Sequence, residues 1–254
     1  MKYMETAIVF SQEALAHDIY SMVITTEQIA KEAKPGQFIS VYSRDGASLL
    51  PRPISICEID GNRLRIVYRV AGKGTKEFSG YRPGDQVRIM GPLGNGFPLE
   101  AAEGKTALII GGGIGIFPLL ELAKGLKGRK EIVLGYRDHV FMKEAFEAWG
   151  PVSVATEDGS QGTKGNVLDA VREKGIKADV IYACGPTPML KGIQFFAAER
   201  NLEAWISLEE RMACGIGACL GCVCKSKEVD HHTNVHNKRI CKDGPVFRGE
   251  EVEL

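Results

Sequence analysis

Four cysteines near the C-terminal end of the sequence have a spacing that is typical of an iron–sulfur site. Four residues separate Cys214 from Cys219, two separate Cys219 from Cys222, and eighteen separate Cys222 from Cys241. This C-x4-C-x2-C run with a distant fourth cysteine matches the ligands of plant-type [2Fe–2S] centres. Small residues let a tight loop direct its thiolates inward, and the loop holds Gly215, Gly217, Ala218 and Gly221. The spacing therefore predicts a [2Fe–2S] cluster.

Two other interpretations of these cysteines are a structural zinc site and a set of ordinary thiols. Zinc usually takes two C-x2-C pairs, and this sequence has one. A Rieske centre would need two histidine ligands. The histidines between the third and fourth cysteine are expected to be solvated loop residues: His231, His232 and His236. Cys224 is a spare thiol on this interpretation, although a ligand exchange with it stays open.

A glycine-rich turn follows a short apolar run and precedes a helical pattern. Gly111, Gly113 and Gly115 come directly after the predicted strand 106–110. Glycines at such a place let the backbone approach a pyrophosphate, and a helix start favours negative charge. Pro118 stands where the third glycine of G-x-G-x-x-G belongs, and proline is tolerated in a first helical turn. The turn predicts a nucleotide site, with a purely structural glycine turn as the alternative.

A second turn, Cys184-Gly185-Pro186, ends the last predicted strand of the same region. Ligands of open α/β sheets bind at the carboxyl ends of strands, where a flat nicotinamide ring could lie against this backbone. A strand-to-helix turn with a buried cysteine is the alternative. Asp138 follows another predicted strand and is a candidate for the ribose hydroxyls of the adenosine. The neighbouring Arg137 leaves the choice between NAD and NADP open.

The first hundred residues contain two fragments that could hold phosphate and a flat ring. Arg52-Pro53-Ile54-Ser55 offers a guanidinium fork and a hydroxyl donor. Val67-Tyr68-Arg69 supplies an aromatic ring, and Gly74 and Thr75 supply backbone and hydroxyl donors. Each fragment taken singly is also compatible with an ordinary strand or turn.

The elements around these motifs change in kind along the chain. Short strands with turn signals are expected at 37–43, 54–59, 63–70 and 86–90, and predict an antiparallel β-barrel. Strands at 106–110, 131–135, 152–156 and 179–184 alternate with helices at 117–126, 142–149, 167–173 and 188–200. This alternation predicts a Rossmann-like parallel α/β sheet.

Three domains follow from this pattern: a barrel at 1–99, an α/β domain at 100–205 and a cluster domain at 206–254. The boundary lies in the Gly/Pro-rich stretch 91–98, which is not expected to form a regular element. Little regular structure is expected from about Ser207 onward. Glu209 and Glu210, beside the cysteine loop, are expected to be solvated or structural.

Composition excludes several classes of protein. The 254 residues carry 32 basic and 32 acidic side chains, a net charge of zero, which argues against a general nucleic-acid binder. The apolar share of 44% disfavours long disorder. The longest uncharged stretch, 106–120, contains four glycines and falls short of the about 20 apolar residues of a membrane span. We expect a soluble, cytoplasmic protein whose clustered cysteines are ligands rather than disulfides.

Taken together, the R-P-x-S, G-x-G-x-x-P and C-G-P motifs resemble the ferredoxin-reductase superfamily. The stretches 210–219 and 241–247 narrow the resemblance to the electron-transfer subunits of NAD-dependent class 1B dihydroorotate dehydrogenases, over essentially the whole chain. The resemblance implies the following FAD contacts: Arg52, Pro53, Ile54, Ser55, Val67, Tyr68, Arg69, Gly74 and Thr75. It also implies cluster ligands at Cys214, Cys219, Cys222 and Cys241.

The resemblance implies electron transfer between a separate FMN-containing catalytic subunit and NAD, through the [2Fe–2S] cluster and FAD, in pyrimidine biosynthesis. The expected assembly is a heterotetramer of two catalytic and two electron-transfer subunits. No catalytic residue is assigned. A small subunit of an NADH-dependent ferredoxin:NADP oxidoreductase or sulfide dehydrogenase is the second hypothesis. A metal-stabilised interaction module without electron transfer is the third.

Overall fold

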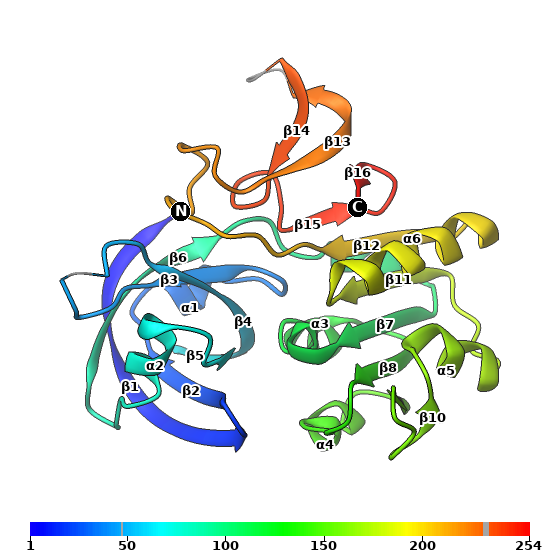
Figure 1. Cartoon of the computed structure of the whole chain (residues 1–254), viewed down its shortest axis with the longest axis horizontal. Helices are drawn as coiled ribbons and strands as arrows, with labels where there is room; N and C mark the ends of the chain where they lie inside the picture. Colours follow the sequence, from blue (N-terminus) through cyan, green and yellow to red (C-terminus); the bar gives the residue numbers. More distant parts are fainter. Residues whose placement is uncertain (47, 231–233) are drawn as a thin grey trace.

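The computed structural model describes residues 1–46, 48–230 and 234–254. A closed barrel and an α/β unit lie side by side in Figure 1, at left and right. The strands of the C-terminal segment lie above the junction between them, and one of them joins the sheet of the α/β unit. The junction of these three parts is where the predicted motifs meet.

The barrel has six strands in the order β1-β2-β5-β4-β3-β6, with all neighbours antiparallel. Their bounds are β1 (Tyr3–Ala16), β2 (Ile19–Thr25), β3 (Phe38–Val41), β4 (Arg52–Asp60), β5 (Arg63–Arg69) and β6 (Gln86–Leu93). Two short helices, α1 (Ile29–Glu32) and α2 (Lys73–Phe78), connect strands. Ile24, Ile56 and Leu64 are fully buried inside the barrel, because inward and outward side chains alternate along each strand.

Two features of the barrel differ from the sequence prediction. The long hairpin β1–β2 was not expected as a pair of strands. Apolar residues such as Met4 and Phe10 lie on the exposed face of β1, so its polar and apolar residues do not alternate cleanly. Strand β6 also continues to Leu93, into the stretch that was predicted to be irregular. Gly91 permits this, because a Cβ there would lie 2.7 Å from Ile39 Cγ2 on the neighbouring strand.

The α/β unit contains a seven-stranded sheet in the order β10-β9-β8-β7-β11-β12-β15. Its parallel strands are β7 (Ala107–Gly112), β8 (Lys130–Tyr136), β9 (Val152–Thr156), β10 (Thr163–Lys164), β11 (Val180–Cys184) and β12 (Glu203–Ser207). The helical turns and helices are η1 (Leu99–Ala102), η2 (Gly113–Ile116), α3 (Leu119–Gly125), α4 (Lys143–Glu147), α5 (Val167–Glu173) and α6 (Thr187–Arg200). The predicted alternation of strands and helices is confirmed.

The expectation of little regular structure after Ser207 was wrong. Strands β13 (Val223–Asp230), β14 (Val235–Arg239) and β16 (Val252–Glu253) form a small antiparallel sheet. Strand β15 (Val246–Arg248) pairs antiparallel with β12 and extends the large sheet. The sheet of β13, β14 and β16 was not predicted because four of the eight residues of β13 are charged and its two valines are exposed, so the strand lacks a buried apolar face.

Candidate functional site

A cavity of about 450 Å³ lies where the barrel, the α/β unit and the C-terminal segment meet. Its wall comes from β4, β5 and α2 of the barrel, from η2 and the turn before α3, and from the chain after β12. Eight of the nine residues predicted to contact FAD line it: Arg52, Pro53, Ile54, Ser55, Val67, Tyr68, Arg69 and Thr75. The fold thus brings the two barrel motifs together around one space.

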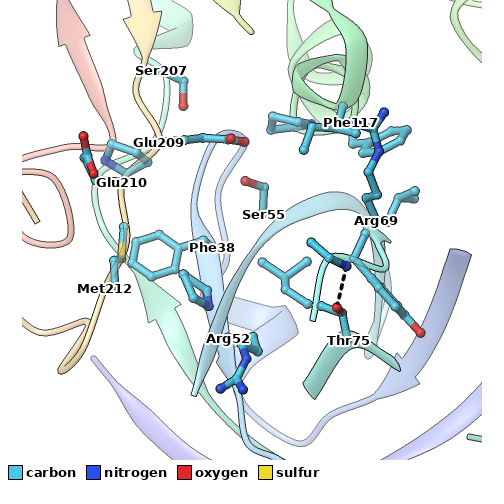
Figure 2. Close-up of a pocket in the computed structure, with 18 of the residues that line it drawn as sticks. Phe38, Arg52, Ser55, Arg69, Thr75, Phe117, Ser207, Glu209, Glu210 and Met212 are labelled. Carbon is cyan, nitrogen blue, oxygen red and sulfur yellow. Dashed lines mark hydrogen bonds between the residues drawn. The ribbon is translucent and has the colours of Figure 1, made fainter. Parts of the chain in front are cut away.

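The ninth predicted residue, Gly74, lies behind Arg52. A Cβ at Gly74 would lie 2.7 Å from Arg52 Nε, so a larger residue would push the guanidinium away. Thr75 Oγ1 accepts the N–H of Ala71 at 2.9 Å, the bond drawn in Figure 2, and fixes the turn that precedes α2. A guanidinium beside the glycine-containing first turn of a helix suits a phosphate. The residues present therefore fit the pyrophosphate of FAD.

Tyr68, near the end of β5, lines the cavity. Its hydroxyl donates to Gln12 Oε1 at 3.0 Å, and Gln12 Nε2 donates to the carbonyls of Phe78 and Tyr81 at 3.0 Å each. Burial raises the pKa of the Tyr68 phenol, so the group stays neutral. This network holds the ring in one orientation, as a flat ligand requires.

The C-terminal half of the chain contributes a wall of the cavity that was not predicted from the sequence. Ser207 is the last residue of β12, and Glu209, Glu210 and Met212 follow it; all four line the cavity, as does Pro245. Figure 2 shows Ser55 and the Glu209 carboxylate both pointing into the central space. Glu209 and Glu210 are thus cavity residues as well as neighbours of the cysteine loop. Their position just past a carboxyl strand end was the available signal.

Glu209 belongs to a small polar group at the end of the sheet. Surrounding protein atoms raise the pKa of its carboxyl, although the side chain still reaches solvent through the cavity. The Cys184 thiol lies near this carboxyl and accepts a hydrogen bond from Ser207. Burial, reinforced by Glu209, raises the pKa of Cys184, so this thiol stays protonated. A carboxyl with a raised pKa can give or take a proton at a ligand in the cavity.

The four predicted ligand cysteines meet beside this cavity. Each of their sulfurs accepts at least one hydrogen bond from a backbone N–H. Cys214 Sγ accepts from Ile216 at 3.4 Å and from Ala218 at 3.3 Å, and Cys219 Sγ accepts from Gly221 at 3.4 Å. Cys222 Sγ accepts from Cys241 at 3.4 Å, and Cys241 Sγ accepts from Gly217 at 3.1 Å. Hydrogen bonds of this kind to sulfur are typical of iron–sulfur sites and tune their potential. The donor set therefore fits a [2Fe–2S] cluster.

The thiols lie in two pairs. Cys219 hydrogen-bonds to Cys214, and Cys241 hydrogen-bonds to Cys222. Burial alone would raise the pKa of Cys214, but the N–H groups around it lower that pKa to about 6, whereas burial raises the pKa of Cys241 to about 12. Among the described residues, no three Cys, His, Asp or Glu side chains are placed to hold one metal ion. Two pairs suit two iron atoms better than a single tetrahedral zinc.

The remaining cysteines lie outside the pairs. Cys57 and Cys184 are buried, and the Cys224 thiol donates to the carbonyl of Lys238 at 3.6 Å. His236 is exposed, and its ring contacts the carbonyl of Lys227. His231 and His232 lie outside the described residues. The ligand set predicted from spacing is therefore the set that the fold gathers.

Two short stretches of chain connect the cysteine site to the cavity. Met212 lines the cavity and precedes Cys214 by two residues, and Pro245 lines it four residues after Cys241. Extended chain spans about 3.5 Å per residue, so these stretches reach at most roughly 7 and 14 Å. Gly215 also packs on the barrel, because a Cβ there would lie 3.0 Å from Ser40 Oγ. The two sites are immediate neighbours.

The predicted nucleotide turns also meet. Strands β7 and β11 are parallel neighbours that align Gly111 with Cys184. A Cβ at Gly115 would lie 2.6 Å from the backbone of Cys184 and of Gly185, and one at Gly112 would lie 3.1 Å from Pro186 Cδ. Close contact between the two turns thus accounts for part of the glycine pattern.

A second cleft, of about 460 Å³, opens between the β1–β2 turn and the end of β8. Gly113, Asp138 and Arg69 line it, and Arg69 lines the first cavity as well. The lining of this cleft does not include Gly111, Gly115 or the turn 184–186. The predicted nicotinamide-nucleotide residues therefore divide between an open cleft and the packed turns behind it.

None of the helices in the described part of the chain is long and apolar enough to cross a membrane.

The sequence pattern of one family, the iron–sulfur cluster binding domain of dihydroorotate dehydrogenase B, matches residues 209–253.

Two curated relatives are similar over nearly their whole length. Both are described as the electron transfer subunit of dihydroorotate dehydrogenase B (NAD(+)). The protein from Caldanaerobacter subterraneus subsp. tengcongensis is 46% identical over 253 residues, which cover 99% of each chain. The protein from Bacillus caldolyticus is 46% identical over 261 residues, which cover 98% of each chain.

Solved structures share the fold. A chain of the NADH-dependent reduced ferredoxin-NADP oxidoreductase, described in connection with flavin-based electron bifurcation, superposes with a TM-score of 0.85 at 31% identity, covering 98% of this chain and 90% of its own. The ferredoxin reductase of carbazole 1,9a-dioxygenase has a TM-score of 0.67 at 20% identity, covering 79% of this chain and 67% of its own, and shows the fold alone.

Proposed function

This chain belongs to the family of electron transfer subunits of NAD-dependent dihydroorotate dehydrogenase B, and from that premise we propose the roles of its residues. It is the subunit that passes electrons from a dihydroorotate-oxidising catalytic partner to NAD+, and its cofactors are a [2Fe–2S] cluster and FAD. The observation that supports this most directly is the contact between the cysteine site and the flavin-type cavity, which two short stretches of chain connect.

When bound, FAD can exchange a hydride with nicotinamide and single electrons with an iron–sulfur cluster. The chain's own residues position these groups. Arg52 and the turn at Gly74 and Thr75 hold the pyrophosphate, and the Tyr68 ring packs against a flat portion of the ligand. The four ligand thiolates take their N–H donors from their own loop and from the turn at Cys241.

The nicotinamide nucleotide enters through the cleft between the barrel and the end of β8. Gly113 leaves room for the phosphates there, and the Asp138 carboxylate accepts hydrogen bonds from the ribose hydroxyls. Asp138 is exposed and would repel a 2′-phosphate, whereas Arg137 in the same cleft would attract one, so the preference for NAD rests on the NAD-dependent relatives. The packed turns at Gly115 and Gly185 hold the strand ends against which the nicotinamide lies.

Glu209 is the proton-bearing group of this site. Its carboxyl points into the cavity beside Ser55, its pKa is raised, and Cys184 and Ser207 lie next to it. These neighbours keep a neutral thiol and an oriented hydroxyl near the place where the hydride donor and acceptor meet. Glu209 can therefore balance the charge that accompanies hydride transfer.

The catalytic partner docks where the cysteine loop reaches the surface. Cys219 is exposed, and two large apolar side chains of the same loop, Ile216 and Leu220, are 41% and 42% exposed. Apolar residues around a redox centre suit a protein contact that excludes water. We infer that this partner carries FMN and that the assembly holds two of each subunit.

A second candidate function is the small subunit of an NADH-dependent ferredoxin:NADP oxidoreductase. The superposition at a TM-score of 0.85 over 98% of this chain favours it. The higher identity to the dihydroorotate dehydrogenase relatives, 46%, favours the first proposal. The two differ in the partner and in the substrate.

Co-expression with each kind of partner decides between them. The complex with an FMN-containing dihydroorotate-oxidising subunit should reduce NAD+ when dihydroorotate is added, whereas this chain alone should not. Purified chain should show flavin absorbance and an iron–sulfur absorbance that dithionite bleaches. Co-purification with a large ferredoxin-like subunit and no dihydroorotate-dependent NADH would support the second candidate. Absence of both absorbance features would overturn both redox functions and leave the metal-stabilised interaction module.

A further inference from the structure

Arg239 is the one buried charged side chain among the described residues, with 5% of its surface exposed. It ends β14 and stands two residues before Cys241. Burying a guanidinium away from water is costly unless hydrogen bonds and an opposite charge compensate it. Its surroundings therefore have to account for its position.

The compensation comes from Asp243, four residues along the chain. Arg239 Nε donates to Asp243 Oδ2 at 3.0 Å, and Arg239 Nη2 donates to Oδ1 at 3.3 Å. The backbone N–H of Arg239 donates to the same Oδ2 at 2.8 Å, and the N–H of Asp243 donates back to the Arg239 carbonyl at 2.7 Å. These bonds close the turn that carries Cys241 into one rigid unit.

The same guanidinium reaches the loop that carries the first two ligands. Arg239 Nη1 donates to the carbonyl of Gly217 at 3.4 Å, and the N–H of Gly217 donates to Cys241 Sγ at 3.1 Å. Gly217 has a φ of +87°, and a Cβ there would lie 2.7 Å from Lys242 Cδ. Gly217 is thus attached to the Cys241 turn through both its backbone groups.

We propose that the Arg239–Asp243 pair, whose guanidinium is buried, is a positioning device for the iron–sulfur site: it fastens the Cys214–Cys219 loop to the distant fourth cysteine, and the Arg239 charge favours the reduced state of the site. This inference rests on the proposed function, because it assumes a cluster at the four cysteines. Eighteen residues separate Cys222 from Cys241, so the fourth thiol needs a fastening that the C-x4-C-x2-C run does not itself supply.

The charges of Arg239 and Asp243 predict the direction in which the midpoint potential of the site should shift when either charge is removed. A cation near an iron–sulfur site stabilises the added electron, and an anion disfavours it, since net charge and hydrogen bonds set the potential. Removing Arg239 should therefore make the midpoint potential more negative, and neutralising Asp243 should make it more positive. If the pair only held the fold together, removing the charge of Arg239 and removing that of Asp243 would not shift the midpoint potential in opposite directions.

The test uses the full chain, purified with its catalytic partner, in four variants: Arg239→Met, Arg239→Lys, Asp243→Asn and, as a control, Arg172→Met on the exposed face of α5. Three quantities are measured: iron loss to a chelator, the midpoint potential of the iron–sulfur signal followed by electron paramagnetic resonance, and FAD content as the sign of a folded barrel. Arg239→Met and Asp243→Asn should lose iron about 10-fold faster, as is usual when outer contacts of a metal site are removed.

Arg239→Lys should keep the wild-type midpoint potential, because it keeps the positive charge. It should lose iron at an intermediate rate, because a lysine ammonium cannot make the paired hydrogen bonds of the planar guanidinium. Arg172→Met should match the wild type in all three measurements. Unchanged iron loss and potential in Arg239→Met, or shifts of the same sign in Arg239→Met and Asp243→Asn, would overturn the proposal. If Arg239→Met retains no FAD, the Asp243→Asn variant alone tests the proposal. It should lose iron about 10-fold faster than the wild type and have a more positive midpoint potential. Wild-type protein without iron would contradict the proposed function instead.

Discussion

Single residues of the cysteine loop act through the backbone as much as through their side chains. Five N–H groups reach the four ligand sulfurs, and three of them come from Ile216, Gly217 and Ala218, the residues between the first two cysteines. Gly217 adopts a positive φ, where a side chain would be strained. The small residues that suggested a tight loop therefore have a second effect, which is to leave these N–H groups free to face sulfur.

Replacing Cys219 by serine should remove the cluster and destabilise the C-terminal segment. The loop around Cys219 is exposed and has little apolar contact of its own, so it depends on its metal bonds. We expect loss of most iron and of the dithionite-bleachable absorbance, measured by iron assay and spectroscopy. Cys224→Ser is the matched control and should retain both. Full iron in the Cys219 variant would refute the ligand assignment.

Replacing Arg52 by alanine should weaken FAD retention. A charge-assisted hydrogen bond contributes about 1.5–3 kcal/mol, which corresponds to roughly 10-fold to 100-fold in the dissociation constant. Fluorescence titration of the deflavinated protein measures this, with Arg52→Lys expected to lie between. Arg88→Ala, whose side chain lies over the Tyr42 ring elsewhere on the barrel, should bind FAD normally. An unchanged dissociation constant in the Arg52 variant would argue against the phosphate role.

At the scale of elements, the glycines after β7 serve packing between two strand ends. The η2 turn lies directly against the turn that joins β11 to α6, with room for no Cβ at Gly115. This contact explains why the G-x-G-x-x-P pattern and the C-G-P turn occur in one chain. It also means that part of the nucleotide motif would be needed even without a nucleotide.

Gly115→Ala should destabilise the protein by about 1–3 kcal/mol, the usual cost of an overpacked contact, because its Cβ would meet backbone atoms 2.6 Å away. Nicotinamide-nucleotide affinity should fall as well, as the strand ends separate. Gly192→Ala within α6 is the control. Its Cβ would make an ordinary 3.5 Å contact with Leu168, so it should stabilise by about 0.5–1 kcal/mol. Thermal unfolding measures both, and equal effects would contradict this explanation.

At the scale of the whole molecule, polar contacts join the barrel to the α/β unit. Glu121 on α3 accepts the N–H of Ile59 at 2.8 Å, and Lys124 donates to the Ile59 carbonyl at 2.9 Å. Lys124 also pairs with Glu58 at 3.5 Å. The barrel and the α/β unit are therefore joined through the end of β4, whose first residues line the cavity.

Glu121 makes this junction pH-dependent. Burial raises the pKa of its carboxyl, although the Ile59 N–H and Lys124 oppose the shift. A folded-state pKa above the unfolded value of about 4.3 means that the free energy of unfolding rises as pH falls through the folded pKa, and levels off below about 4.3. Glu121→Gln should remove this part of the pH dependence.

Urea unfolding followed by flavin fluorescence, repeated at several pH values, measures that change. Glu147→Gln, on the exposed side of α4 and paired with Lys143, is the control and should keep the wild-type profile. A Glu121→Gln profile parallel to that of the wild type at every pH would show that the junction carboxylate does not cause the dependence.

Much of the fold was predictable from local pattern. The strand Val152–Thr156 and the helix Val167–Glu173 were predicted with the bounds that the structure has, because apolar periodicity and turn residues are local signals. Hairpin β1–β2 and the sheet of β13, β14 and β16 were not predicted. Their strands carry charged or outward apolar side chains, and only pairing with distant strands makes them regular.

The sequence by itself predicted four ligand cysteines, the barrel motifs and the alternation of strands and helices in the α/β unit, because these depend on residue type and short spacing. The tertiary structure alone decided that Ser207, Glu209 and Pro245 share a cavity with Arg52 and Tyr68, and that Arg239 fastens Gly217 to the Cys241 turn. Such contacts join residues whose separation along the chain carries no periodic signal. They arise when burial of one continuous apolar core, which includes Phe38, Ile206 and Cys241, brings three parts of the chain together.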